Sequence, residues 1–207
     1  MTIHAVIFDY DGTAIDSMPL VHAGVCEVFN ACGIVPPGYP EFLRSFRSPY
    51  LDWYRSRGIM MSDEDIREIY FRNTRSDDAP LVHGFADAVM QLRSRRCLLG
   101  VVSSHEEFKI RRRLVMREGL FGPMDPIVGL AFKKVTSLRG LCAAYGLDSH
   151  EALYIGDIES DVRDGNEAGL ITAAYLGADG SEEAFPEHRP NIWIRDMASL
   201  PEMIRTL

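Results

Sequence analysis

Lysine is scarce in this chain, which has 3 lysines and 19 arginines among its 207 residues. Two of the lysines, Lys133 and Lys134, are adjacent, and this singles the pair out for a specific role. Acidic residues outnumber basic ones by 30 to 22, so the formal net charge is −8. That balance argues against a nucleic-acid partner bound mainly through phosphate contacts. It does not exclude a small anionic substrate, because a local site can be positive on an acidic protein.

Cysteine is also sparse, and its spacing fits no familiar metal site. The chain has no run of about 18 apolar residues, so no membrane span is expected. Its first residues lack the basic and apolar segments of a secretory signal. We expect the cysteines to be reduced thiols of a cytoplasmic protein. They are Cys26, Cys32, Cys97 and Cys142.

Helix and strand patterns alternate through residues 81–207, after an apolar run at residues 3–8. This alternation predicts an α/β fold with a Rossmann-like parallel sheet and helices on both faces. Residues 16–80 show only helical patterns. We therefore predict a core of residues 1–15 and 81–207 and an inserted all-α cap of residues 16–80, placed to act as a lid. Strands are expected at 3–8, 98–102, 127–130, 152–155, 171–175 and 192–194, and helices at 19–32, 63–75, 84–95, 106–118, 136–145, 161–168 and the C-terminal end.

The first predicted strand ends in the segment Asp9-Tyr-Asp11-Gly12-Thr13. A buried strand that delivers carboxylates to its carboxyl end puts charge where open α/β sheets bind ligands. Two acids there suggest separate tasks, one as nucleophile or metal ligand and one in acid–base chemistry. Gly12 permits a sharp turn directly after them. The plain alternative is a common Asp-Gly turn.

Two later segments place phosphate-binding side chains at loop positions. Ser103 and Ser104 follow the second strand, where a hydroxyl and nearby N–H groups can hold a phosphate oxygen. The alternative is that one of them only caps the next helix. The Lys133-Lys134 pair precedes a helix and can neutralise carboxylates and hold a phosphoryl group. The alternative for the pair is a solvated surface position.

A second carboxylate segment, Gly156-Asp157-Ile-Glu-Ser-Asp161, follows another buried strand. Magnesium prefers a few carboxylates together with water and a substrate phosphate, so Asp157 is a good candidate ligand. Asp161 has the alternative of an acid favoured by the dipole at a helix start. Gly156 allows the backbone to approach closely.

In this order the segments resemble the four motifs of the haloacid dehalogenase-like (HAD) hydrolases, over nearly the whole chain. The helical insertion resembles the cap of the phosphoglycolate phosphatase and β-phosphoglucomutase branch, with little motif-level likeness in the cap itself. The family often has Lys-Pro-x-Pro at its third motif, and this chain lacks both prolines. Lys134 is preferred as the motif lysine because its spacing to Leu138 and Gly146 fits a variant of the motif. Lys133 is the alternative.

The resemblance implies a magnesium-dependent phosphatase acting on a small phosphorylated metabolite. Asp9 would be the nucleophile that forms an aspartyl-phosphate, and Asp11 the group that donates and accepts the proton. Magnesium would be held by Asp9, the backbone carbonyl of Asp11, and Asp157. Lys134 would act in catalysis and, together with Ser103 and Ser104, would hold the phosphoryl group. The residues that support the site would be Asp161, Gly12 and Thr13.

The same residues discriminate between the proposed phosphatase and several other functions. Dehalogenases of this superfamily lack a carboxylate at the position of Asp11, and phosphonatases use a cap lysine that is absent here. A phosphomutase keeps both acids and is the enzymatic alternative. A non-enzymatic phosphoacceptor or binding protein on the same core is the other. The oligomeric state is left open, as is the identity of the substrate.

The cap offers weaker candidates. Arg44 and Arg47 are three residues apart, so they could share a helix face and reach an anionic substrate. The alternative is that both are solvated or paired with acids. His22, His83 and His105 show no partner pattern typical of a metal site.

Overall fold

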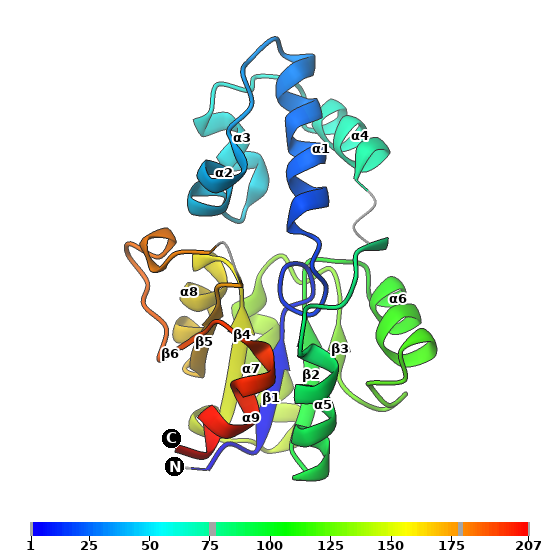
Figure 1. Ribbon diagram of the computed structural model, residues 1–207, viewed down its shortest axis with the longest axis vertical. Helices are drawn as coiled ribbons and strands as arrows, with labels where there is room; N and C mark the ends of the chain where they lie inside the picture. Colours follow the sequence, from blue (N-terminus) through cyan, green and yellow to red (C-terminus); the bar gives the residue numbers. More distant parts are fainter. Residues whose placement is uncertain (1, 75–77, 178–179, 207) are drawn as a thin grey trace.

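The computed structural model describes residues 2–74, 78–177 and 180–206. Figure 1 shows a sheet-and-helix part that carries both termini, with a purely helical part beyond one edge of the sheet. The described residues form one six-stranded sheet of order β3-β2-β1-β4-β5-β6, and every pairing is parallel. The predicted fold class is therefore confirmed. The strands are β1 Ala5–Phe8, β2 Leu98–Val102, β3 Ile127–Val128, β4 Ala152–Gly156, β5 Ile171–Tyr175 and β6 Ile192–Ile194.

The register of the central strands brings three strand ends to one edge of the sheet. Phe8 of β1 lies opposite Val101 of β2 and Ile155 of β4. All four residues of β1 are buried, as expected for a strand covered on both faces. The residues that follow β1, β2 and β4 therefore emerge side by side, which is the edge where ligands bind in such sheets.

Helices cover both faces of the sheet. Side chains alternate along β1, so Phe8 packs with Phe85 and Leu114 on one face, while Ile7 packs with Leu138 on the other. Among the described residues the helices of this core are α5 Phe85–Ser94, α6 Glu107–Ile110, a π-helix Arg111–Arg117, α7 Lys134–Tyr145, α8 Glu159–Ala168 and α9 Leu200–Met203, with 3₁₀ turns at Ser149–Glu151, Glu182–Ala184, Met197–Ser199 and Ile204–Thr206.

The insertion packs around its own hydrophobic cluster, which includes Val25, Phe42, Tyr54 and Ile66. No strand occurs in its described residues, 16–74 and 78–80. Ser62 caps the last helix of the insertion, because its Oγ accepts a hydrogen bond of 3.1 Å from the Asp65 N–H. The helices are α1 Met18–Ala31, α2 Tyr39–Ser45, α3 Tyr50–Ser56 and α4 Asp63–Asn73.

The two chain segments that connect the insertion to the core run antiparallel to each other. Ile15 and Leu81 form an isolated bridge. The Asp16 N–H donates to the Pro80 carbonyl at 2.9 Å, and the Val82 N–H to the Ala14 carbonyl at 3.0 Å. The insertion is thus joined to the core by two adjacent connecting segments, which lie directly beside the loop that follows β1.

The structure differs from the predicted elements at several ends. The strand expected at 127–130 stops at Val128, and Leu130 has a φ of 53°, which lies outside the extended region that a strand requires. The helix expected at 106–118 changes to a π-helix at Arg111. The helices expected from residues 136 and 161 begin two residues earlier, at Lys134 and Glu159.

Candidate active site

Asp9 is the first residue after β1, and its backbone still belongs to the sheet. Its N–H donates to the Ile155 carbonyl at 2.8 Å, which fixes the residue at the end of the strand. Asp9 is buried. Burial raises the pKa of its carboxyl group to about 6, with the charge of Asp161 adding to the rise and Lys134 opposing it.

Lys134 is the cation of the site. Its Nζ lies 3.0 Å from Oδ1 of Asp9 and 2.5 Å from Oδ1 of Asp161. Burial alone would lower the pKa of this ammonium, but Asp161 and Asp9 outweigh burial and raise the pKa well above its usual value. Lys133, in contrast, is exposed and sits just before the first residue of α7. The structure therefore brings Lys134, and not Lys133, to the carboxylates.

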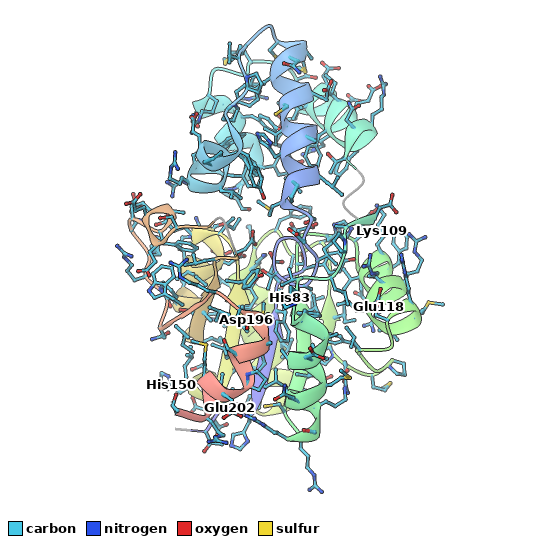
Figure 2. All side chains as sticks on the ribbon, viewed as in Figure 1. His83, Lys109, Glu118, His150, Asp196 and Glu202 are labelled. Atoms are coloured by element: carbon cyan, nitrogen blue, oxygen red, sulfur yellow. The ribbon has the colours of Figure 1, made fainter. Side chains whose placement is uncertain are left out.

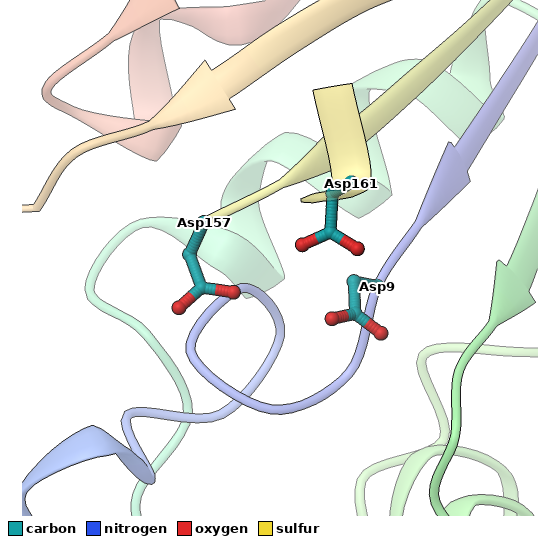
Figure 3. A group of neighbouring side chains, drawn as sticks. All are labelled: Asp9, Asp157 and Asp161. Carbon is teal, nitrogen blue, oxygen red and sulfur yellow. The ribbon is translucent and has the colours of Figure 1, made fainter. Parts of the chain in front are cut away.

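Three carboxylates from two strand ends converge beside this lysine. Oxygens of Asp9, Asp157 and Asp161 all lie within 4.8 Å of one another, and Figure 3 shows them facing a common point. Burial raises the pKa of Asp157 well above its usual value, with Asp161 and Asp9 adding to the rise. Clustered carboxylate oxygens are the donor set of a hard divalent cation, so these three residues, of which Asp157 is half-buried, fit a divalent metal ion.

The members of this cluster differ in their other bonds. Oδ1 of Asp161 accepts from Lys134 and, at 3.3 Å, from the Tyr154 hydroxyl, so its oxygens are largely occupied. Among the described residues, the side-chain hydrogen bond that Asp157 accepts is a long one of 3.5 Å from Thr13 Oγ1. Asp157 is thus the better placed metal ligand, and Asp161 is placed to hold Lys134.

Gly12 allows the loop after β1 to approach Asp157 closely. Its φ is +72°, in the left-handed region. A Cβ at this position would lie 2.1 Å from Oδ2 of Asp157. Both the backbone conformation and the close approach therefore require glycine here.

Asp11 contacts a histidine that sequence reasoning missed. Oδ2 of Asp11 lies 3.0 Å from Nδ1 of His105, two residues beyond Ser103. His83 is exposed on the core surface (Figure 2), and His22 bonds the Pro37 carbonyl within the insertion. The one available sequence signal for His105 was its place just after a predicted strand end.

Ser103 lies at the end of β2 and is buried, whereas Ser104 is exposed. The Ser103 hydroxyl oxygen accepts a hydrogen bond of 3.2 Å from the His105 N–H. Neither serine caps the following helix, since its N-cap residue is Glu106 without a side-chain bond. The alternative interpretation of these serines as helix caps is therefore wrong.

Comparison with known proteins now identifies the family. A protein-family model described as haloacid dehalogenase-like hydrolase matches residues 6–175. The chain belongs to the haloacid dehalogenase-like hydrolases. Pyrophosphatase PpaX from Bacillus pumilus is 25% identical over 214 residues, covering 96% of this chain and 95% of that protein. Phosphoglycolate phosphatase from Synechococcus elongatus is 28% identical and covers 83% of each chain.

The fold agrees with this assignment. The solved structure of a hydrolase from Pseudomonas syringae superposes with a TM-score of 0.77 at 18% identity and covers 99% of both chains. The family is one of hydrolases, and the relatives that match over most of the chain are named as phosphatases, in agreement with the predicted enzyme class and with the branch that the helical insertion resembles. The non-enzymatic alternatives gain no support from them. Within the described residues, no helix is long and apolar enough to span a membrane.

The helical insertion contacts the core through residues that differ from those expected. Arg44 and Arg47 do not share a helix face, because α2 ends at Ser45 and Arg47 lies beyond it. The Arg47 guanidinium instead forms an ion pair with the buried carboxylate of Glu159, at the first turn of α8. The expectation of a common arginine face is therefore wrong.

A cavity of about 370 Å³ lies in the cap next to this contact. Arg47 lines it and Arg44 does not. The Ser48 N–H beside it donates to Ser160 Oγ of α8 at 3.4 Å, so the cavity adjoins the helix that carries Asp161. Its lining residues are Ser45, Arg47, Ser48, Pro49, Asp52, Trp53, Ser56 and Arg57.

The insertion also comes near Asp11. Burial raises the pKa of the Tyr70 hydroxyl, and the nearby carboxylate of Asp11 raises it further. Tyr70 belongs to α4, so that cap helix lies close to the carboxylate loop. Trp53 and Tyr54 are buried and pack with Phe29, as expected for aromatic residues of the cap core.

Proposed function

We propose that this protein is a magnesium-dependent phosphatase that hydrolyses a small phosphomonoester through an aspartyl-phosphate. One observation carries the proposal. Asp9, a buried carboxylate at a strand end, lies next to the ammonium group of Lys134 and next to Asp157, a second carboxylate that could bind a cation. A second acid, Asp11, lies two residues away. Nucleophile, cation site and acid–base group are thus gathered at one edge of the sheet.

In the first step an oxygen of Asp9 attacks phosphorus, and the bond from phosphorus to the ester oxygen breaks. Asp11 gives its proton to that leaving oxygen. In the second step water attacks phosphorus, Asp11 takes a proton from it, and the bond from Asp9 to phosphorus breaks. Inorganic phosphate leaves and both carboxylates regain their initial state.

The charges of the site support transfer to a buried carboxylate. Lys134 offsets the charge of Asp9 and is placed to hold a phosphoryl oxygen. Ser103, at the end of β2, offers a hydroxyl for another, with exposed Ser104 less well placed. A magnesium ion held by Asp9, Asp157 and the backbone carbonyl of Asp11 would offset the repulsion between phosphate and carboxylates.

We further propose that residues 16–80 are a cap domain that encloses the substrate. The cap contacts α8 through Arg47, and the charge of Asp11 raises the pKa of Tyr70 in α4, so the cap lies next to the catalytic edge. Enclosure favours small phosphorylated metabolites over phosphoproteins. The names of the relatives, phosphoglycolate phosphatase and pyrophosphatase, support small substrates. Of Arg44 and Arg47, Arg47 is better placed to contact a second anionic group of the substrate. The cytoplasmic location of the protein stays a prediction.

The proposal is tested with a panel of small phosphorylated metabolites and one phosphopeptide, each incubated with magnesium. Phosphate release from one or more metabolites, with higher kcat/KM than for the phosphopeptide, is the expected result. Asp9→Asn serves as the control, because an amide oxygen is a poor nucleophile. Release by the control at a wild-type rate would contradict the nucleophile assignment. Conversion of a sugar phosphate to its isomer without phosphate release would identify a mutase instead.

A further inference from the structure

The proposed mechanism leaves one close contact of the catalytic edge without a role, that between His105 and Asp11. Nδ1 of the imidazole lies 3.0 Å from Oδ2 of the carboxylate, and the two side chains are 14% and 28% exposed. We propose that His105 is a positioning residue that holds Asp11 in the orientation needed for proton transfer. This inference rests on the proposed phosphatase function.

The structure fixes His105 on several sides. Its backbone N–H donates to Ser103 Oγ at 3.2 Å, and its carbonyl accepts from the Leu130 N–H at 2.8 Å. Its ring packs against Tyr10, with ring centroids 5.1 Å apart. These contacts join His105 to residues of the core, next to the loop that carries Asp11.

Asp11, in contrast, stands on a loop. The chain turns away directly after it, at the positive φ of Gly12. Oδ1 of Asp11 is buried and has no hydrogen-bond partner among the described residues. The contact of Oδ2 with His105 is thus the polar contact that selects one orientation of this side chain.

This geometry assigns different tasks to the two oxygens of Asp11. With Nδ1–H of His105 donating to Oδ2, Oδ1 is the oxygen left to carry the proton. That proton passes from Oδ1 to the leaving oxygen as the ester bond breaks. A proton from the attacking water returns to Oδ1 as the bond between Asp9 and phosphorus breaks. His105 itself neither gains nor loses a proton in either step.

Two substitutions separate the hydrogen bond from the packing of the ring. His105→Asn keeps an N–H donor close to the position of Nδ1 but removes the ring. His105→Phe keeps a ring against Tyr10 but removes the donor. If His105 acts by positioning Asp11, the asparagine variant stays close to the wild-type rate and the phenylalanine variant does not. A merely structural role predicts the opposite ranking.

The readout is a single-turnover reaction with p-nitrophenyl phosphate, recording nitrophenol and phosphate release together. Nitrophenol release reports phosphorylation of Asp9, and this leaving group departs without a proton. Phosphate release reports hydrolysis, which needs Asp11 as base. His105→Phe is expected to release nitrophenol at the wild-type rate and phosphate about 10- to 100-fold more slowly, a part of the usual acid–base contribution. Added to Asp11→Asn, it is expected to cause no further loss.

The other outcomes overturn the inference. It fails if His105→Phe hydrolyses the intermediate at the wild-type rate, if it slows both steps equally, or if His105→Asn is the slower variant. It also fails if the double variant is slower than Asp11→Asn alone. Absence of both products with the wild-type enzyme overturns the proposed function, and the positioning role with it. Thermal unfolding of each variant confirms that the compared proteins are folded.

Discussion

Replacing Lys134 with methionine is expected to destabilise the metal-free protein strongly. The side chain is 10% exposed and its ammonium touches both Asp9 and Asp161, which are 8% and 2% exposed. Methionine keeps most of the aliphatic length but leaves the buried carboxylates without their cation. Removing one partner of a buried ion pair typically costs about 3–5 kcal/mol. For a protein of this size, that is a fall in Tm of roughly 6–20 °C.

The pH dependence of this loss has a definite sign. The pKa of Lys134 is raised in the folded state. Its ionised form therefore adds its full contribution to the free energy of unfolding below the unfolded pKa of about 10.4, and that contribution is lost only as the pH rises through the folded pKa. At pH 7.5 the wild type therefore has the full contribution. The pKa of Asp9 is already about 6. Protonation of Asp9 in the variant relieves the repulsion between the carboxylates of Asp9 and Asp161, so the loss of stability should be smaller at pH 5 than at pH 7.5.

The assay is urea and thermal unfolding in the presence of a chelator, with Lys133→Met as the matched control. Lys133 is exposed, and a surface substitution of this kind changes stability by no more than about 0.5 kcal/mol. Phosphatase activity should be lost with Lys134→Met and kept with Lys133→Met. Equal stability of the two variants would refute the reasoning, as would a loss that is the same at both pH values.

Three further substitutions test the cation site and the acid–base group. Gly12→Ala should weaken magnesium binding in titration calorimetry, since the new Cβ would lie 2.1 Å from Oδ2 of Asp157; unchanged affinity would contradict this. Asp157→Asn should raise the Tm of the metal-free protein at neutral pH. The pKa of Asp157 is raised in the folded state, so ionisation of this carboxyl group destabilises the fold as the pH rises above about 3.9, and asparagine does not ionise. The same variant should lose the Tm gain that magnesium gives the wild type, and a retained gain would place the ion elsewhere. Asp11→Asn should bind magnesium almost normally, because its proposed ligand is the backbone carbonyl, yet lose about 10²–10⁴-fold in turnover. A wild-type rate would move the acid–base task to another residue.

The catalytic edge was predictable because it follows from strand order and strand ends. Asp9 and Asp157 each follow a short, apolar, buried run, and parallel strands in register must deliver such residues to the same edge. The spacing that favoured Lys134 over Lys133 has a physical counterpart. Lys134 begins α7, whose first turn lies against the carboxylates, and Lys133 remains outside.

The contacts that sequence reasoning missed join residues far apart in the chain. His105 meets Asp11 across 94 residues, and Arg47 meets Glu159 across 112. No local pattern encodes such pairs, since they depend on how the loops and the cap are placed over the sheet. The short cap helices α2 and α3 were missed for a different reason. Each has seven residues bordered by Pro or Gly, too few for a helical period to stand out.

The central claim is that Asp9 becomes phosphorylated. Asp11→Asn, mixed with p-nitrophenyl phosphate and magnesium and quenched in acid, should hold the intermediate because its hydrolysis is slow. Intact-protein mass spectrometry should show one added phosphoryl group, and peptide mapping should place it on Asp9. The Asp9→Asn variant should show none. A phosphoryl group on any other residue, or none at all while the wild-type protein releases phosphate, would contradict the account.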